Sequence, residues 1–285
     1  MPILRTLVAD ATERLSLGPH PDRARQDAEF LIQHLLRRNR AWLLTHGDHE
    51  LSTADAGAYA SFIERRRSGE PIQYITREVE FYGLTLAVTP KVLIPRPETE
   101  HLVEKAIKLS FDFSKPRILD IGTGSGAIAI AVAHDVSPYA SITATDISRQ
   151  ALKIARFNAR RTGFLRKIRF VQGDLLAPVA EEQFDIIVSN PPYVPTADRD
   201  SLSVEVRDHE PALALFAGED GLDVYRRLIP DAFSALAEGG YLLLEIGYGQ
   251  SETIAALLEG AGFAGVEIVP DLQEIPRVAC ARRPL

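Results

Sequence analysis

The residues best suited to chemistry in this sequence stand together at the end of one apolar run. Residues 184–189 read Phe-Asp-Ile-Ile-Val-Ser, and their β-branched centre predicts a strand that is buried on both faces. The run stops at Asn190, Pro191, Pro192 and Tyr193, because a proline has no N–H to donate to a sheet or a helix. Asn190 is therefore expected at the carboxyl end of a central strand, where open α/β sheets bind their ligands.

These four residues could hold a planar amino group. The side chain of Asn190 offers an acceptor and a donor, and the carbonyl oxygens of Pro191 and Pro192 have no helical partner. Tyr193 supplies a flat face on which a planar group can stack. Two acceptors would then hold the hydrogens of an –NH2 group while the ring packs on its plane. The alternative is a proline-rich turn that only ends the strand.

A second candidate site lies upstream, where a short strand at 116–121 runs into a glycine-rich loop. The loop consists of Gly122, Thr123, Gly124, Ser125 and Gly126, and a helix of small apolar residues follows it at 127–133. Strand, loop and helix in this order predict the first unit of a doubly wound fold, and the glycines let the backbone approach a ligand closely. The loop also satisfies the loose dinucleotide fingerprint, and a turn without any ligand is a further alternative.

Acidic residues follow the next two predicted strands. Asp146 ends the strand at 141–146 and lies 20 residues beyond Gly126, where an acid can accept hydrogen bonds from a ribose diol. Asp174 and Leu175 follow the strand at 168–171, and a carboxylate beside an apolar side chain can bind the amino group of an adenine and cover its face. Each of these features also has an interpretation without a ligand. Asp146 could be an acid at the start of a helix, and Asp174 and Leu175 could belong to a simple turn.

The remaining pattern divides the chain into three regions. Residues 1–75 have helical periodicity and little glycine, which predicts a small N-terminal helical bundle that could recognise a partner or act as a scaffold. Residues 76–95 place strand formers around Gly83 and predict a β-hairpin linker. Residues 96–285 carry the predicted strands and both candidate sites, and their polar stretch at 195–208 is long enough for a mobile lid.

Composition and charge disfavour several classes of function. The 285 residues carry 32 basic and 39 acidic side chains, and the net charge of −7 argues against tight phosphate-driven binding of nucleic acid. The run Arg65-Arg66-Arg67 is a local basic patch, which we interpret as a solvated helix face. The single cysteine, Cys280, excludes a disulfide framework and a cysteine metal site, and no metal is expected. No apolar run reaches spanning length and the chain does not open like a signal peptide, so the cytoplasm is the expected location.

Together, Ile118 to Gly126, Asp146, Gly173-Asp174 and Asn190 to Tyr193 resemble the class I S-adenosylmethionine-dependent methyltransferases. Asn-Pro-Pro-Tyr in particular is similar to the motif of those that methylate planar amino or amide nitrogens. The segments at 69–75, 93–100, 210–211 and 244–247 resemble the release-factor glutamine methyltransferases, the PrmC/HemK family. The resemblance covers the whole chain, and the order and spacing of the motifs make it specific.

The resemblance implies an α/β fold with a doubly wound, seven-stranded Rossmann-like methyltransferase sheet at 96–285. It makes the helical domain at 1–75 the region for substrate recognition, and it keeps 76–95 as the hairpin linker. The implied reaction moves a methyl group from S-adenosyl-L-methionine, leaving S-adenosyl-L-homocysteine, to the side-chain amide of the glutamine in the Gly-Gly-Gln motif of peptide chain release factors. The release factor is the expected partner, and we expect a monomer that binds neither membrane nor, stably, nucleic acid.

By the same resemblance, Gly122 to Gly126 lie along the methionine part of the cofactor, Asp146 holds the ribose, and Asp174 and Leu175 flank the adenine. Asn190 to Tyr193 hold the glutamine amide. Asn190, Pro191 and Tyr193 are then the catalytic residues, and Asn190 also borders the cofactor. The chain departs from the family pattern at 271–277, where relatives often have a glycine.

Other functions fit parts of the sequence. A methyltransferase of a ribosomal-protein glutamine would use the same motifs. An adenine or cytosine amino-methyltransferase of nucleic acid faces the same planar –NH2 group, although the charge and the whole-chain resemblance count against it. A nicotinamide enzyme would need only the glycine loop and Asp146, which leaves Asn190 to Tyr193 unexplained. A cofactor-binding regulator of translation would have no use for Asn190 and Tyr193.

Overall fold

The computed structural model describes every residue from Met1 to Leu285, and it divides into two compact units. The helical unit consists of Met1–Glu78 and Leu202–His209, and the sheet unit consists of Val79–Ser201 and Glu210–Leu285. The sequence assigned 202–209 to the region after residue 96, so this grouping was not anticipated. The boundaries after residues 75 and 95 stay predictions. No helix is both long enough and apolar enough to cross a membrane.

The helical unit packs short helices around an apolar core. Its helices are α1 (Leu4–Ser16), α2 (Ala24–Leu36), α3 (Arg40–Thr45), α4 (Thr53–Arg67), α5 (Ile72–Thr76) and α9 (Val204–His209). Asn39 and Ser52 cap α3 and α4, each by accepting a backbone N–H in the first turn. The hydroxyl of the buried Tyr59 donates to the carbonyl oxygen of Ala28, which ties α4 to α2.

The arginine run on α4 is not a solvated face at its centre. Arg66 is only 2% exposed, and its Nε donates to Oδ2 of the equally buried Asp27 over 2.6 Å. The guanidinium of Arg66 also pairs with Glu205 on α9. The interpretation of this run as solvated is therefore wrong for Arg66, because a buried guanidinium needs carboxylate partners and finds them on α2 and α9.

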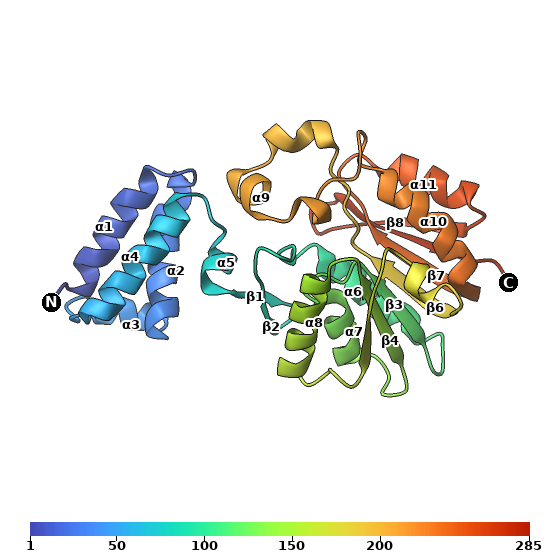
Figure 1. Ribbon diagram of the computed structural model, residues 1–285, viewed down its shortest axis with the longest axis horizontal. Coiled ribbons are helices and arrows are strands. Elements are labelled where there is room, and N and C mark those ends of the chain that lie inside the picture. Colours follow the sequence, from blue (N-terminus) through green and yellow to red (C-terminus); the bar gives the residue numbers. More distant parts are fainter. The chain divides into compact units, whose positions relative to one another are not determined.

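A hairpin and a seven-stranded sheet organise the sheet unit (Figure 1). The hairpin strands are β1 (Glu78–Phe81) and β2 (Leu84–Ala87), and Tyr82 and Gly83 between them both have positive φ, as a two-residue turn with the correct twist requires. The sheet strands are β3 (Arg117–Ile121), β4 (Ser141–Asp146), β5 (Ile168–Gln172), β6 (Phe184–Ser189), β7 (Leu236–Glu245), β8 (Ala264–Pro270) and β9 (Pro276–Arg282). Their order is β5-β4-β3-β6-β7-β9-β8, in which β9 runs antiparallel to both of its neighbours, β7 and β8, and the other pairs are parallel.

Helices cover both faces of this sheet. On one face lie α6 (Thr99–Ser110), α7 (Ala127–Asp135) and α8 (Arg149–Arg161), and on the other lie α10 (Asp223–Ala235) and α11 (Ser251–Gly260) (Figure 1). Successive residues of β6 face opposite cores: Ile186 and Val188 join the first and Ile187 joins the second. Every residue of β6 is buried, as its apolar run predicted. The predicted doubly wound fold is confirmed.

Candidate active site

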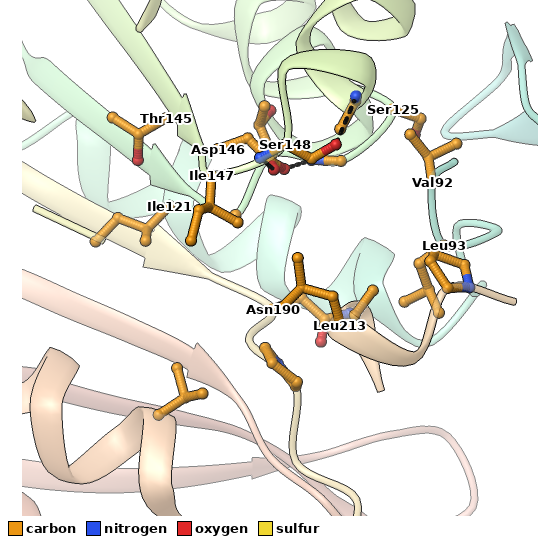
Figure 2. Close-up of a pocket in the computed structure, with 18 of the residues that line it drawn as sticks. Val92, Leu93, Ile121, Ser125, Thr145, Asp146, Ile147, Ser148, Asn190 and Leu213 are labelled. Atoms are coloured by element: carbon orange, nitrogen blue, oxygen red, sulfur yellow. Dashed lines mark hydrogen bonds between the residues drawn. The ribbon is translucent and has the colours of Figure 1, made fainter. Parts of the chain in front are cut away.

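A pocket opens at the carboxyl ends of β3, β4 and β6, next to the point where the strand order reverses (Figure 2). Its cavity volume is about 330 Å³. Nine of the predicted site residues line it, namely Gly122, Thr123, Gly124, Ser125, Asp146, Asp174, Leu175, Asn190 and Pro192. Figure 2 shows Asp146 and Asn190 on opposite sides of this cavity. The structure thus brings the two candidate sites of the sequence into one place.

The glycine loop is held from below by a buried carboxylate. Asp120, on β3 just before the loop, contacts both the loop and α7. Its Oδ2 accepts from the hydroxyl of Thr123 over 2.6 Å and from the backbone N–H of Ala129 over 3.2 Å. Burial raises the pKa of the Asp120 carboxyl to about 7. Gly122 and Gly124 have positive φ, and a Cβ on Gly122 would meet nothing within 4 Å. The loop therefore keeps its backbone accessible for a ligand.

Asp146 both shapes the loop and lines the pocket. Its Oδ2 accepts from the N–H of Gly124 and its Oδ1 accepts from the N–H of Ser148, each over 2.8 Å. Burial raises the pKa of this carboxyl, against the lowering effect of the two hydrogen bonds. The remaining lone pairs of the carboxylate are free to accept from a ligand.

Steric constraints determine the turn that carries Asp174 and Leu175. A Cβ on Gly173 would lie 2.5 Å from Cγ of Pro178, so only glycine fits there. Leu175 has a φ of 48°, which is a strained value for a leucine. Asp174 forms an ion pair with Arg227, and both side chains line the pocket.

Asn190 is fixed by two side chains from other elements. Its Nδ2 donates to Oγ1 of Thr99, at the start of α6, over 3.2 Å. The Thr99 hydroxyl in turn donates to Oε2 of Glu245, at the end of β7, over 2.6 Å. Thr99 and Glu245 are each 3% exposed, and burial raises the pKa of Glu245 to about 7. Asn190 therefore has a defined orientation at the edge of the pocket.

Pro191, Tyr193 and Gly126 do not line the pocket. Pro191 is buried, and Gly126 is the N-cap residue of α7 with a φ of 84°. The side chain of Tyr193 packs against the apolar core beneath α10 and α11, and burial raises its pKa to about 12. Its carbonyl oxygen accepts from Nε2 of Gln250. The stacking role of Tyr193 stays a prediction.

Comparison with known proteins decides the family. Residues 6–76 match the PrmC N-terminal domain, and residues 99–206 match the methyltransferase small domain. The release factor glutamine methyltransferase of Deinococcus radiodurans is 46% identical over 283 residues, which are 98% of each chain. That of Koribacter versatilis is 42% identical over 261 residues, or 91% of each chain. This chain belongs to the release factor glutamine methyltransferase family.

Solved structures support the fold of this methyltransferase family member. The ribosomal protein L11 methylase from Lactobacillus delbrueckii subsp. bulgaricus aligns with a TM-score of 0.50 and 24% identity, over 70% of this chain and 84% of that chain. At this identity the likeness concerns the fold alone. The predicted family and fold class are both confirmed.

Two further walls of the pocket come from segments whose contact with each other was not predicted from the sequence. One side is lined by Lys91, Val92, Leu93 and Pro95, and another by Pro211, Leu213, Ala214 and Phe216. Glu210 holds these walls together, because its buried carboxylate accepts from the N–H of Ile94 over 3.1 Å and pairs with Arg96. The segments were recognisable as family motifs, but nothing in either one indicated that it bonds to the other.

Proposed function

We propose that this protein transfers a methyl group from S-adenosylmethionine to the side-chain amide nitrogen of the glutamine in the Gly-Gly-Gln motif of peptide chain release factors. The observation that carries this proposal is the position of Asn190, which lines the same pocket as the glycine loop in a chain that matches release factor glutamine methyltransferases over 98% of its length. Asn190 and the glycine loop thus line one cavity.

The residues of the pocket fit S-adenosylmethionine. The backbone of the turn at Gly122 has room for a ligand where a Cβ would stand, and Asp146 offers acceptor oxygens to ribose hydroxyls. Asp174 and Leu175 provide a polar and an apolar side for the adenine. Bound there, S-adenosylmethionine supplies a methyl group on a sulfonium, which is open to in-line attack by a nucleophile.

The target nitrogen is a weak nucleophile, because its lone pair is delocalised into the amide carbonyl. Oδ1 of Asn190 and the carbonyl oxygen of Pro191 would accept its two N–H groups and stabilise positive charge that develops on nitrogen. Neither oxygen accepts a hydrogen bond from another group of the protein. Fixed orientation toward the methyl group supplies the rest of the rate enhancement. The methylated nitrogen is strongly acidic and loses its proton to these acceptors or to water, so no dedicated base is required.

We further infer that the enzyme works as a monomer in the cytoplasm, where its substrate is found, and that the helical unit contributes to recognition of the release factor. The net charge of −7 disfavours stable binding of nucleic acid. Tyr193 would support the substrate end of the site, and its replacement by alanine should mainly weaken substrate binding.

The test is methyl transfer from labelled S-adenosylmethionine to three acceptors offered side by side. These are an unmethylated release factor, the same factor with the Gly-Gly-Gln glutamine replaced by alanine, and bulk DNA and RNA. Label only on the intact factor supports the proposal and identifies the modified residue. Label on nucleic acid would mean that Asn190 to Tyr193 hold a base, and label on both versions of the factor would place the methyl group elsewhere.

A further inference from the structure

The amide of Asn190 can sit in two orientations that have nearly the same shape, and only one of them serves the proposed reaction. Oxygen and nitrogen of a side-chain amide are almost equal in size, so packing alone does not select between them. Methyl transfer to an amide nitrogen needs the oxygen of Asn190 at the pocket, because the substrate presents N–H donors. The surroundings of the Asn190 amide must therefore select its orientation.

We propose that Glu245 and Thr99 are positioning residues for methyl transfer, which act together to turn the oxygen of Asn190 toward the substrate amide. The inference rests on the proposed function and adds two residues to it. Thr99 lies at the first position of α6 and Glu245 at the last position of β7, so the sheet unit brings them to Asn190 from two separate elements.

The direction of each hydrogen bond follows from the ionised state of Glu245. A carboxylate only accepts, so the proton of the Thr99 hydroxyl must point to Oε2 of Glu245, over 2.6 Å. The lone pairs of Thr99 Oγ1 then face Asn190, and only the NH2 group of the amide can satisfy them, over 3.2 Å. The opposite orientation would place two acceptor oxygens against each other in a buried site.

Burial of Glu245 is difficult to explain by packing alone. An ionised carboxylate loses much of its hydration at 3% exposure, and an apolar side chain would fill the same space without that cost. The side chain does not have a close ion-pair partner. Arg277 on β9 favours its charged form electrostatically and Glu98 opposes it, while Asn190 and Thr99 both donate to it. Tyr193 and Tyr225 also face this group.

The charge state of Glu245 changes in the physiological range, because burial raises its pKa to about 7. A protonated Glu245 can donate to Thr99, whose hydroxyl is then free to donate to Oδ1 of Asn190. The chain of hydrogen bonds runs in reverse, and the NH2 group of Asn190 faces the pocket. We therefore expect kcat to fall as pH drops through about 7, without a matching rise in the KM for the cofactor.

The experiment measures steady-state methylation of an unmethylated release factor by the full chain between pH 5.5 and 9, a range of roughly two units around the expected pKa. Thr99→Val removes the hydroxyl and should lower kcat roughly 10- to 100-fold while the cofactor KM changes by about twofold or less. Thr99→Ser restores the hydroxyl and should restore most of kcat. Glu245→Gln cannot ionise, so its kcat should not fall as pH drops through about 7. This fall of kcat in the wild type is called the acid limb below.

The matched control is Tyr225→Phe. The hydroxyl of Tyr225 donates to the main-chain oxygen of Glu245 over 2.6 Å, so this variant disturbs the same buried place without breaking the path to Asn190. It should keep the acid limb of the wild type. Thermal unfolding of each variant distinguishes a folding defect from a kinetic one. If Thr99→Val does not fold, the pH profile of kcat in Glu245→Gln tests the proposal on its own.

Two results would overturn the proposal. The first is a wild-type kcat in a folded Thr99→Val protein. The second is an acid limb that persists in Glu245→Gln, which would point to Asp120, whose pKa also lies at about 7 beneath the glycine loop. A wild-type protein that does not methylate the release factor at any pH refutes the proposed function instead, so the two failures are distinguishable.

Discussion

Asn158 on α8 donates from Nδ2 to the carbonyl oxygen of Ser125, over 2.9 Å, and so fixes the glycine loop to the helix that packs beside it. The same side chain accepts from the N–H of Ala87 over 2.7 Å and donates to the oxygen of Ala87 over 2.9 Å. Asn158 is completely buried. One amide thus joins the hairpin strand β2, the cofactor loop and α8.

Replacement of Asn158 by alanine should weaken both the sheet unit and its cofactor pocket. The change leaves the buried carbonyl oxygen of Ser125 and the two partly buried backbone groups of Ala87 without their partners, and we expect a loss of about 2 to 4 kcal/mol in local stability. Hydrogen exchange of the amides in β3 and β4 measures this loss, and calorimetry measures S-adenosylmethionine binding. Lys153→Ala, on the exposed face of the same helix, is the control and should change neither. Unchanged cofactor affinity in Asn158→Ala would show that the loop keeps its shape without this amide.

Removal of the Asn190 side chain should affect turnover much more than cofactor binding. Loss of one acceptor for a developing charge typically lowers kcat by about 100- to 1,000-fold, and we expect Asn190→Ala in this range. Cofactor affinity, measured separately by calorimetry, should stay close to that of the wild type because Asn190 only borders that part of the pocket. An equal fall in cofactor affinity and turnover would refute the acceptor role.

Local patterns in the sequence were sufficient to predict the strand β6, the glycine loop and the position of Asn190. Each depends on residues that are neighbours in the chain: β-branched residues make the strand, and prolines end it. The partners of Asn190 could not be predicted in the same way. Thr99 and Glu245 are 91 and 55 residues away from it, and only the order of strands and helices brings them together. Hydrogen bonds between distant side chains leave no periodic signal.

Arg66 illustrates the same limit in the helical unit. Its place in a run of three arginines on a helix indicates a solvated face, whereas its burial depends on Glu205, which lies 139 residues further along the chain. Arg66→Ala leaves the buried Asp27 without its main partner, and we expect the helical unit to lose about 3 to 5 kcal/mol. Trp42, the only tryptophan, lies on α3 and reports the unfolding of this unit by its fluorescence.

Arg67, the neighbour of Arg66 on α4, supplies the control for the predicted effect of Arg66→Ala. Arg67 pairs with Glu64 on the surface, where both side chains are about half exposed, so Arg67→Ala should cost at most about 1 kcal/mol. Hydrogen exchange in 202–209 should rise in Arg66→Ala and stay unchanged in Arg67→Ala. Equal effects of the two changes would mean that the buried ion pairs do not hold α9.

The stability of the sheet unit should depend on pH through Glu245. The folded pKa of about 7 lies above the ordinary value of 4.5, so the folded protein binds this proton more tightly than the unfolded chain does. The stabilising contribution of the proton is fully present below pH 4.5 and is lost as pH rises through about 7. Glu245→Gln has no such dependence, and it should therefore become more stable than the wild type as pH rises.

The difference between wild type and Glu245→Gln isolates this one group, although Asp120 titrates in the same range in both proteins. A shift from 4.5 to about 7 corresponds to about 3 kcal/mol, so the variant should gain up to this amount on the wild type between pH 4.5 and 8. Hydrogen exchange of the β6 and β7 amides, corrected for the intrinsic effect of pH, measures the difference. A constant difference across this range would show that the pKa of Glu245 is not raised in the folded protein, and hence that its environment offsets the cost of burying the carboxylate.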